Sequence, residues 1–461
     1  MSDSSSAPHI ALLPSSGMGH LTPFLRLAAS LVSNCNCHVT LITIQPTVSL
    51  SESQLISNFC SSFPQITPKQ FQLLPFDPST AHSQDPFFLH MESIRRSAHL
   101  LSPVLSSPAS PPLNTLIIDI TLTSAFLPVT SNLNISSYIL FTSSAKMLSL
   151  CVYFTKILES STESNEYFEI PGTSPLPISS VPPVLFDLSS LFTCHFIENG
   201  SKLVESNGIL INTLESLESE TLAALNDGKV VDGLPPVISI GPLVPCEFEK
   251  SSVSSPLRWL DNEQRGSVVY VSFGSRTAMG RAQIRELAVG LVESECRFLW
   301  VVKDKKVDRE EEEGLEIILG NELMQKVKEK GLVLKEWVDQ EGILSHSSVG
   351  GFVSHCGWNS VTEAALYGVP ILAWPQHGDQ RINAGVVEEN ELGLWVKSWG
   401  WGDGQVLVKG EEIGKKIKEL MNDGRLKLKA AHVKDIAKKA IEVDGTSKNG
   451  FSKFINSCNK L

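Results

Sequence analysis

The chain has 461 residues, of which 42% are apolar and 19% charged, and its formal net charge is −12. This length suits two domains of roughly 200 residues each, and the composition excludes disordered and fibrous proteins. The acidic balance argues against nucleic acid or an anionic membrane as a partner, although backbone amides at a helix N-terminus can still bind a small phosphorylated ligand.

Targeting and redox signals are weak. No apolar run reaches the ~18 residues that span a bilayer, and the first residues lack a basic region followed by a long apolar run. The nine cysteines include no Cys-x-x-Cys or Cys/His group with zinc spacing. We therefore expect a cytoplasmic protein with reduced thiols and no bound metal.

The first half of the chain predicts a parallel α/β sheet. Residues 9–14 form a short apolar run, residues 15–19 a Gly-containing turn, and the stretch from His20 has apolar residues at helical spacing, with Pro23 in its first turn. Further apolar runs predict strands at 38–44, 116–120, 137–141 and 208–212. The first 230 residues hold only 8 of the 38 basic and 17 of the 50 acidic residues, as expected of walls around a fairly apolar ligand.

The α/β pattern starts again in the second half. Strands are predicted at 267–273, 298–302, 332–334, 351–353 and 370–373, with a helix over 282–293. We predict an acceptor-binding domain over 1–244, a Ser-rich linker over 245–256, a second domain over 257–440, and a C-terminal helix over 441–461 that packs back on the first domain. The expected architecture is two doubly wound, Rossmann-like domains facing across a cleft, with the ligand at the C-terminal ends of the strands.

The densest motif runs from Trp337 to Gln380. Residues 350–354 form a strand that turns into a helix beginning near Asn359 or Ser360, both of which are good N-cap types. The amides of the first helical turn would point toward an anion. His355 can donate to a phosphate at this position, and Gly357 lets the backbone approach closely.

Acceptor groups follow the predicted anion site. Glu363 lies one helical turn further on, where it can accept from ribose hydroxyls. Asp379 and Gln380 form an acceptor-rich pair suited to sugar hydroxyls, and Trp337 could stack on a base. Taken singly, each of these residues is more often a core aromatic or a satisfied polar group; the whole constellation favours a nucleotide-sugar site.

The segment 337–380 resembles the signature box of the plant family 1 UDP-glycosyltransferases. The resemblance extends over nearly the whole chain, including residues 17–20 and 272–275. It implies the GT-B fold, with the donor in the C-terminal domain and the acceptor in the N-terminal one. Two positions depart from the box: Val338-Asp339 replaces its usual Ala-Pro, and His377-Gly378 stands where many relatives carry a bulky aromatic.

The resemblance also implies a role for each matching position. Uracil would stack on Trp337, and the backbone of Val338 and the side chain of Gln340 would complete the base and ribose site. Glu363 would hold the ribose. The diphosphate would be bound by His355, Gly357, Asn359 and Ser360, with help from Ser275, and the sugar by Trp358, Asp379 and Gln380. Thr142 would reach a sugar hydroxyl or a phosphate. A terminal Gln usually accompanies UDP-glucose, which would be a co-substrate.

His20 and Asp119 are the catalytic candidates. His20 lies at a helix N-terminus, where the helix dipole favours the neutral imidazole that can accept a proton. Asp119 ends a strand and would orient the ring and stabilise the imidazolium. As isolated residues, both could equally be capping groups, but the family's His–Asp pair matches their positions. The resemblance therefore implies that His20 deprotonates the acceptor, that the anomeric configuration inverts, and that no metal is needed.

The acceptor is less constrained. Residues 85–99, 275–280 and 374–384 resemble the subgroup that C-glucosylates phloretin-like and 2-hydroxyflavanone-like phenols. Phe87, Phe88 and His90 are candidate pocket walls, with loop–helix packing an equal alternative for each. O-glucosylation of plant phenols is the competing function, and a catalytically silent nucleotide-sugar binder is a remote one. A nicotinamide-dependent dehydrogenase is disfavoured, because no complete Gly-x-Gly-x-x-Gly follows either opening strand. We expect a monomer.

Overall fold

The computed structural model of the chain divides into two compact units. One comprises residues 1–249 and 439–461, and the other residues 250–438. The structure describes residues 7–81, 83, 85–160, 166–246, 249, 255–274, 277, 279–303, 314–336, 338–400 and 406–459. Most of the predicted linker over 245–256 lies outside these ranges.

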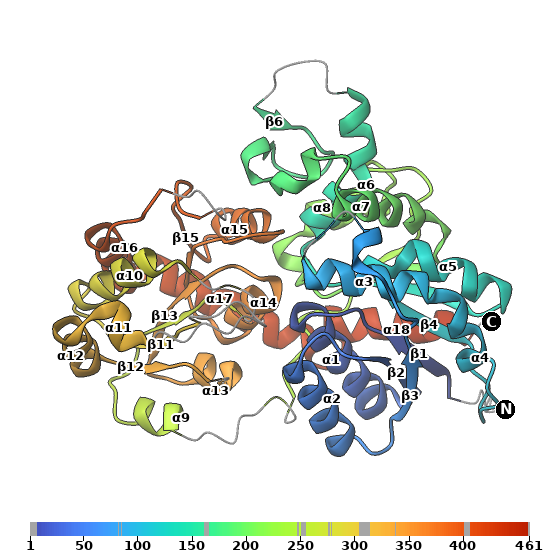
Figure 1. Cartoon of the computed structure of the whole chain (residues 1–461), viewed down its shortest axis with the longest axis horizontal. Coiled ribbons are helices and arrows are strands. Elements are labelled where there is room, and N and C mark those ends of the chain that lie inside the picture. The colour runs from blue at the N-terminus through green and yellow to red at the C-terminus, as the bar shows by residue number, and fades with distance from the viewer. Residues whose placement is uncertain are drawn as a thin grey trace. The chain divides into compact units, whose positions relative to one another are not determined.

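The first unit is built on a seven-stranded sheet in the order β3-β2-β1-β4-β5-β8-β9, and each neighbouring pair is parallel (Figure 1). Its strands are β1 (His9–Leu13), β2 (His38–Gln45), β3 (Thr67–Gln72), β4 (Thr115–Asp119), β5 (Ser136–Phe141), β8 (Gly208–Ile211) and β9 (Val237–Ser239). A separate antiparallel pair joins β6 (Tyr167–Phe168) to β7 (Leu176–Pro177). The central strands are continuous apolar runs because both faces of a parallel sheet are covered.

Helices cover both faces of this sheet. They are α1 (Met18–Cys35), α2 (Leu50–Ser62), α3 (Pro86–Arg96), α4 (Leu101–Leu105), α5 (Thr123–Asn132), α6 (Ala145–Ser160), α7 (Leu191–Lys202), α8 (Ser219–Asn226) and α18 (Thr446–Cys458). One core joins α1, α2 and α18 to one face of the sheet. In α18, Phe454 packs edge-to-face on Tyr138 with 4.8 Å between ring centroids, and the Tyr138 hydroxyl donates to Ser457 Oγ at 2.7 Å.

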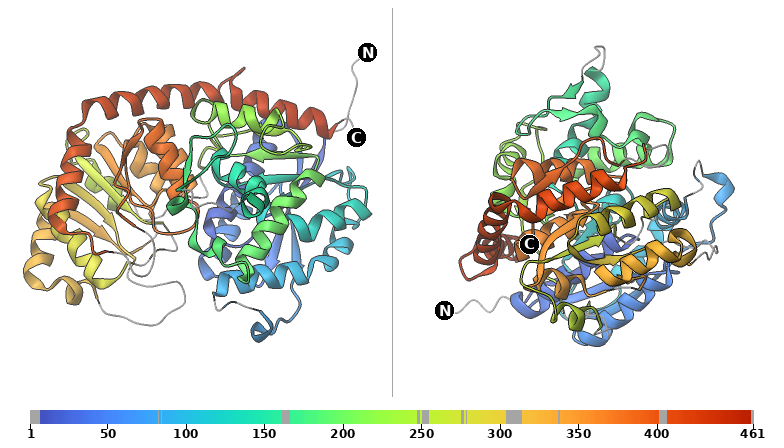
Figure 2. Two further views of the ribbon diagram at one scale, coloured as in Figure 1. Left: turned by 90° about the horizontal axis from the view of Figure 1, so that it is seen from above. Right: turned by 90° about the vertical axis from the view of Figure 1, so that its left-hand side faces the viewer.

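The second unit holds a six-stranded parallel sheet in the order β12-β11-β10-β13-β14-β15. Its strands are β10 (Val268–Ser272), β11 (Arg297–Val301), β12 (Gly331–Leu334), β13 (Val349–Ser354), β14 (Ile371–Ala373) and β15 (Gly393–Trp395). Its helices are α9 (Ser255–Leu260), α10 (Arg281–Glu293), α11 (Leu315–Leu319), α12 (Asn321–Lys330), α13 (Gln340–Ser345), α14 (Trp358–Tyr367), α15 (Gln380–Glu389), α16 (Gly410–Asn422) and α17 (Gly424–Ile441), the last of which runs on into the first unit (Figure 2).

The predicted strands are confirmed to within two residues at each end, but the first helix begins earlier than expected. Gly17 is the N-cap of α1, so Pro23 lies inside the helix rather than in its first turn. The glycine's φ of 98° allows the chain to enter the helix directly from the turn after β1. His20 thereby becomes the third residue of α1.

The order of strands reverses once in each sheet. In the first unit the reversal lies between β1 and β4, and in the second between β10 and β13. In parallel α/β sheets, the loops on either side of such a reversal run to opposite faces of the sheet, and ligands bind at the carboxyl ends of the strands there. Each unit therefore presents one position at which residues far apart in sequence can meet.

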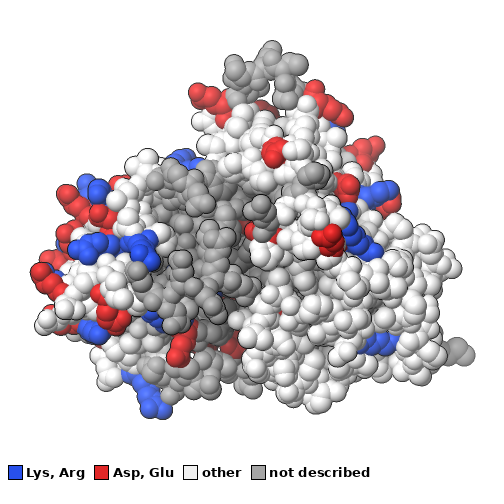
Figure 3. All heavy atoms as spheres, viewed as in Figure 1, with Lys and Arg blue, Asp and Glu red and all other residues white. Residues whose placement is uncertain are grey.

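None of the nine cysteines forms a disulfide. Among the described helices, none has the length and hydropathy required to cross a membrane. Charged atoms are dense over α10, α12 and α16 of the second unit and sparse over α1 and α2 of the first (Figure 3), in line with the uneven charge of the sequence.

Candidate functional site

A histidine–carboxylate pair lies at the reversal point of the first unit. His20 follows β1 in the first turn of α1, and Asp119 is the last residue of β4. His20 Nδ1 lies 2.9 Å from Asp119 Oδ2, and the carboxylate is 0% exposed while the ring is 26% exposed. Since Nδ1 faces an acceptor, it carries the proton and Nε2 is the nitrogen that can accept one. The predicted contact between the two residues is thus present.

The other carboxylate oxygen of Asp119 is also bonded. Asp119 Oδ1 accepts from the backbone amide of Thr121 at 2.9 Å and from its hydroxyl at 2.6 Å. Burial by itself would raise the pKa of Asp119, but the charge and hydrogen bond of His20 and the bonds from Thr121 hold that pKa below its usual value. The carboxylate is therefore ionised and fixed in orientation.

Thr142 joins this pair rather than standing apart from it. It follows β5, is 9% exposed, and places Oγ1 3.2 Å from His20 Nδ1. The sequence analysis assigned it to a sugar hydroxyl or a phosphate. In the structure its described contact is with the same ring nitrogen that faces Asp119.

Buried Glu52 of α2 holds the turn before His20 in place, and the sequence analysis missed it. Glu52 Oε1 accepts from the amide of Gly17 at 2.6 Å, and its side chain is 4% exposed. A Cβ at Gly17 would stand 2.8 Å from Cε2 of Phe87, which explains why this position has no side chain. No local motif marks Glu52, because it lies 35 residues from its partner.

Phe87 and Phe88 lie close to the pair, and a third aromatic extends them. The rings of Phe87 and His20 have centroids 6.3 Å apart. The ring centroid of Phe88 lies 5.7 Å from that of Phe87 and 5.2 Å from that of Phe192 in α7. The sequence analysis did not single out Phe192. An aromatic surface therefore begins beside His20 and continues onto α7.

His90 has a different environment from that of the two phenylalanines. Its Nε2 donates to the Pro46 carbonyl at 2.8 Å, so its Nδ1 accepts from Ser16 Oγ at 2.5 Å. Burial lowers the pKa of His90, which favours this neutral form. Both ring nitrogens thus bond within the first unit, as in the loop–helix packing weighed as the alternative for this residue.

The reversal point of the second unit holds His355 between two glycines. A Cβ at Gly274 or at Gly357 would stand 2.5 Å from His355 Nε2. Burial lowers the pKa of His355 to about 3, and neighbouring His377 adds to the shift. Its ring is therefore neutral, and Nδ1 has no hydrogen-bond partner among the described residues. Ser275, predicted to lie nearby, falls outside those residues.

The helix after His355 begins with Trp358, and Gly357 is its N-cap. The prediction that Asn359 or Ser360 caps it is wrong, because the cap is Gly357, which has no side chain that could bond to the amides of the first turn. Glycine takes this position because a side chain would collide with His355. Trp358, the first residue of the helix, is only 3% exposed.

Three predicted nucleotide-binding side chains meet around Gln340. Its Nε2 lies 2.8 Å from Glu363 Oε2 and 3.1 Å from Ser360 Oγ. Its Oε1 accepts at 3.1 Å from the hydroxyl of Tyr270, a β10 residue that the sequence analysis missed. Val338 is nearly buried, at 7% exposed, and Trp337 lies outside the described residues. The cluster therefore joins the start of α13 to Ser360 and Glu363 of α14.

Gln380 and Asp379 follow β14 at the start of α15. Gln380 Oε1 accepts from the amides of Gln376 at 2.8 Å and His377 at 3.0 Å. His377 in turn lies 3.3 Å from Thr277 Oγ1, so the residue that replaces a bulky aromatic is itself bonded. Asp379 Oδ2 accepts from Asn383 Nδ2 at 2.8 Å.

The two sets of residues have different chemical abilities. The first offers a histidine held by an ionised carboxylate beside aromatic rings, which is suited to taking a proton from an apolar, hydroxyl-bearing molecule. The second offers a helix N-terminus with a neutral imidazole, followed by carboxylate and amide groups, which suits an anion carrying sugar hydroxyls.

Comparison with known proteins bears on both sets. Residues 241–423 match the family profile described as UDP-glucoronosyl and UDP-glucosyl transferase. A UDP-glycosyltransferase of Citrus unshiu, 708G2, is 56% identical over 100% of this chain and 99% of its own length.

Solved structures agree over the whole chain. The crystal structure of LpCGTa in complex with UDP has a TM-score of 0.88 and 49% identity, covering 99% of this chain and 100% of that one. The structure of UGT71G1 of Medicago truncatula complexed with UDP-glucose has a TM-score of 0.85 and 27% identity, covering 100% of both chains. These relatives share the two Rossmann-like units and the GT-B fold.

Proposed function

The chain belongs to the UDP-glycosyltransferase family, and from that premise we propose that it transfers glucose from UDP-glucose to small phenols with inversion at the anomeric carbon. The preferred products are C-glucosides of phloretin-like or 2-hydroxyflavanone-like acceptors. The observation that carries the proposal is the contact between His20 and the buried carboxylate of Asp119 at 2.9 Å.

His20 acts as the base. Its Nε2 takes the proton of a phenol hydroxyl, and Asp119 stabilises the imidazolium that forms while holding the ring in one orientation. The phenolate attacks the anomeric carbon from the face opposite the diphosphate, the bond from that carbon to the phosphate oxygen breaks, and UDP leaves with the electron pair. General-base catalysis of this kind contributes ~10²–10⁴-fold.

The donor binds to the second unit. We place the diphosphate at the N-terminus of α14 beside the neutral ring of His355, the ribose at Glu363, and the glucose at Asp379 and Gln380 at the start of α15. The helix amides stabilise the charge that grows on the leaving UDP. Transfer then proceeds without an added metal, and we expect it to persist in excess chelator.

Acceptor orientation decides which atom is glucosylated. A deprotonated phenol is ambident, so an ortho ring carbon can attack in place of the oxygen and then lose its proton to restore the aromatic ring. The same His20–Asp119 pair serves both reactions. The resemblance of residues 85–99 to the C-glucosylating subgroup, with Phe87 beside His20, favours carbon attack. O-glucosylation is the alternative.

The deciding experiment incubates the purified chain with UDP-glucose and phloretin and then heats the product in acid. A C-glucoside survives because its new bond is carbon–carbon, whereas an O-glucoside is hydrolysed to free phloretin. An acid-labile product would replace C- by O-glucosylation, and binding of UDP-glucose without turnover on any phenol would indicate a silent binder.

The base assignment is tested in the same assay. His20→Ala should lower kcat by roughly 10²–10⁴-fold while calorimetry shows UDP affinity nearly unchanged. His99→Ala, which removes an exposed imidazole from the same unit, is the matched control and should keep full activity. Loss of UDP binding together with transfer in His20→Ala would contradict the assignment.

A further inference from the structure

Asn199 of α7 forms hydrogen bonds with the turn that follows Asp119. Its Nδ2 donates to the Thr121 carbonyl at 2.9 Å, and its Oδ1 accepts from the amide of Ser124 at 2.9 Å. The side chain is 3% exposed. Asn199 lies 78 residues from Thr121 in sequence, so only the tertiary structure brings the two together.

The turn in question is the short segment between β4 and α5. It contains Thr121, whose amide and hydroxyl both donate to Asp119 Oδ1, at 2.9 and 2.6 Å. The carboxylate therefore depends on Thr121 for one oxygen and on His20 for the other. Because Asn199 holds the carbonyl of Thr121, a shift of α7 or the loss of this amide would move the donors to Asp119 as well.

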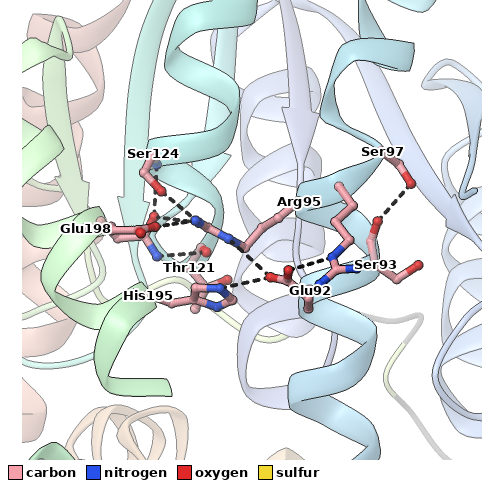
Figure 4. A network of polar contacts seen from close by, with 10 residues as sticks. Glu92, Ser93, Arg95, Ser97, Thr121, Ser124, His195 and Glu198 are labelled. Carbon is pink, nitrogen blue, oxygen red and sulfur yellow. Dashed lines mark hydrogen bonds and ion pairs between the residues drawn. The ribbon is translucent and has the colours of Figure 1, made fainter. Parts of the chain in front are cut away.

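A polar cluster fixes the outer side of this arrangement. Arg95 of α3 donates to Ser124 Oγ at 2.7 Å, to Asn199 Oδ1 at 3.5 Å and to Glu198 Oε2 at 2.5 Å (Figure 4). On the same side, His195 Nε2 lies 2.9 Å from Glu92 Oε2. Burial lowers the pKa of His195, and the positive charge of Arg95 acts in the same direction. The cluster ties α3, α7 and the start of α5 together.

We propose that Asn199 is a positioning residue for the His20–Asp119 pair: through Thr121 it sets the orientation of the Asp119 carboxylate, and hence that of the His20 ring. The inference rests on the proposed function, because it assigns a role within the same base. Asn199 does not touch the reacting atoms. Its effect is on kcat, since the ring acts only in the step in which the acceptor loses its proton.

Two substitutions distinguish the effect of losing the hydrogen-bond donor of Asn199 from the effect of losing its side-chain volume. Asn199→Ala removes all three hydrogen bonds of this side chain, to Thr121, Ser124 and Arg95. Asn199→Asp keeps the shape and the acceptor facing the Ser124 amide and Arg95, but at neutral pH it no longer donates to the Thr121 carbonyl. We expect both variants to lower kcat by roughly 10²-fold, the scale of a misplacement of about 1 Å, with the KM for UDP-glucose unchanged.

Asn226→Ala is the matched control for lost hydrogen bonds. Asn226 ends α8, and its side-chain amide also makes three bonds, to the Leu222 carbonyl at 3.0 Å and to the carbonyl and amide of Val237 at 3.0 and 2.9 Å. Val237 is the first residue of β9 and Asp119 is the last residue of β4. Since the strands are parallel, the two residues lie at opposite ends of the sheet's strands. This variant should lose stability but keep the wild-type kcat.

A second readout does not depend on turnover. In the full chain labelled with ¹³Cε1-histidine, the His20 signal is identified by its absence in His20→Ala, and its titration is followed by NMR. Asp119→Asn should move the midpoint to lower pH, because a neutral partner no longer favours the imidazolium. Asn199→Ala should move it the same way by roughly half a pH unit, the equivalent of one modest hydrogen bond.

The outcomes are distinguishable. A wild-type chain that transfers no glucose to any phenol refutes the proposed function, and the titration still decides the role of Asn199. With an active wild type, an unchanged kcat in Asn199→Asp, or an unmoved His20 midpoint in Asn199→Ala, overturns the positioning role. An equal loss of kcat in Asn226→Ala overturns it too, because the effect would then follow from general destabilisation.

Discussion

His355→Gln should make the second unit less sensitive to acid. Burial holds the pKa of His355 at about 3 in the folded chain, whereas a histidine in an unfolded chain titrates near 6.5. Between these values the unfolded state carries one more proton than the folded state. The folded-state pKa is depressed, so the stability linked to this ring is fully present above pH 6.5 and is lost as the pH falls toward 3.

The magnitude follows from the size of that gap. A pH of 5.0 is about 1.5 units below the pKa of His355 in the unfolded chain, and each unit corresponds to about 1.4 kcal/mol. Protonation of this ring in the unfolded state therefore lowers the free energy of unfolding at pH 5.0 by roughly 2 kcal/mol relative to pH 7.5. Glutamine cannot take up a proton here and has no such penalty. The fall in stability between the two pH values should therefore be about 2 kcal/mol smaller in His355→Gln than in the wild type.

The sequence supplies a probe that reports on the correct unit. All 8 tryptophans lie between residues 259 and 401, inside the second unit. Urea unfolding followed by tryptophan fluorescence at pH 7.5 and pH 5.0 thus measures this unit without interference from His9, His90 and His195, whose pKa values are also lowered by burial in the first.

The control is His432→Gln, which removes an exposed imidazole from α17 of the same unit. Because the removed side chain is exposed, this variant should lose as much stability between pH 7.5 and 5.0 as the wild type does. If His355→Gln loses as much stability between pH 7.5 and 5.0 as the wild type, the neutral, buried state of His355 is refuted.

Two further predictions concern the nucleotide site. Gly357→Ala should weaken UDP binding at least about 10-fold, because the new Cβ would stand 2.5 Å from His355 Nε2 and displace the ring. The control is Gly280, which is also a helix N-cap with a negative φ. A Cβ added there would meet no atom within 4 Å, so Gly280→Ala should bind UDP normally in calorimetry. Tyr270→Phe should weaken UDP binding by roughly 2- to 10-fold, because it removes the hydroxyl that donates to Gln340. Such a hydrogen bond contributes about 0.5–1.5 kcal/mol. Unchanged affinity would show that this hydroxyl does not orient Gln340.

Local sequence predicted the central strands of both sheets but not the edge strands β3, β9 and β15. Apolar runs predicted the central strands because both faces of a parallel sheet are buried. The His20 and Asp119 positions followed from their places after or at the ends of such strands. The helix after His355 was misplaced by one or two residues, because capping preference favours Asn359 and Ser360, whereas the close approach of the His355 ring requires glycine at the cap.

The sequence by itself indicated the family, the α/β class and the residues that we propose bind a nucleotide sugar, since these depend on short patterns that each strand and turn carries locally. Only the tertiary structure decided which side chains hold those residues. Glu52 reaches Gly17 across 35 residues, Tyr270 reaches Gln340 across 70, and Asn199 reaches Thr121 across 78. No local pattern marks such partners, because the packing of elements that are distant in sequence, rather than proximity along the chain, brings them together.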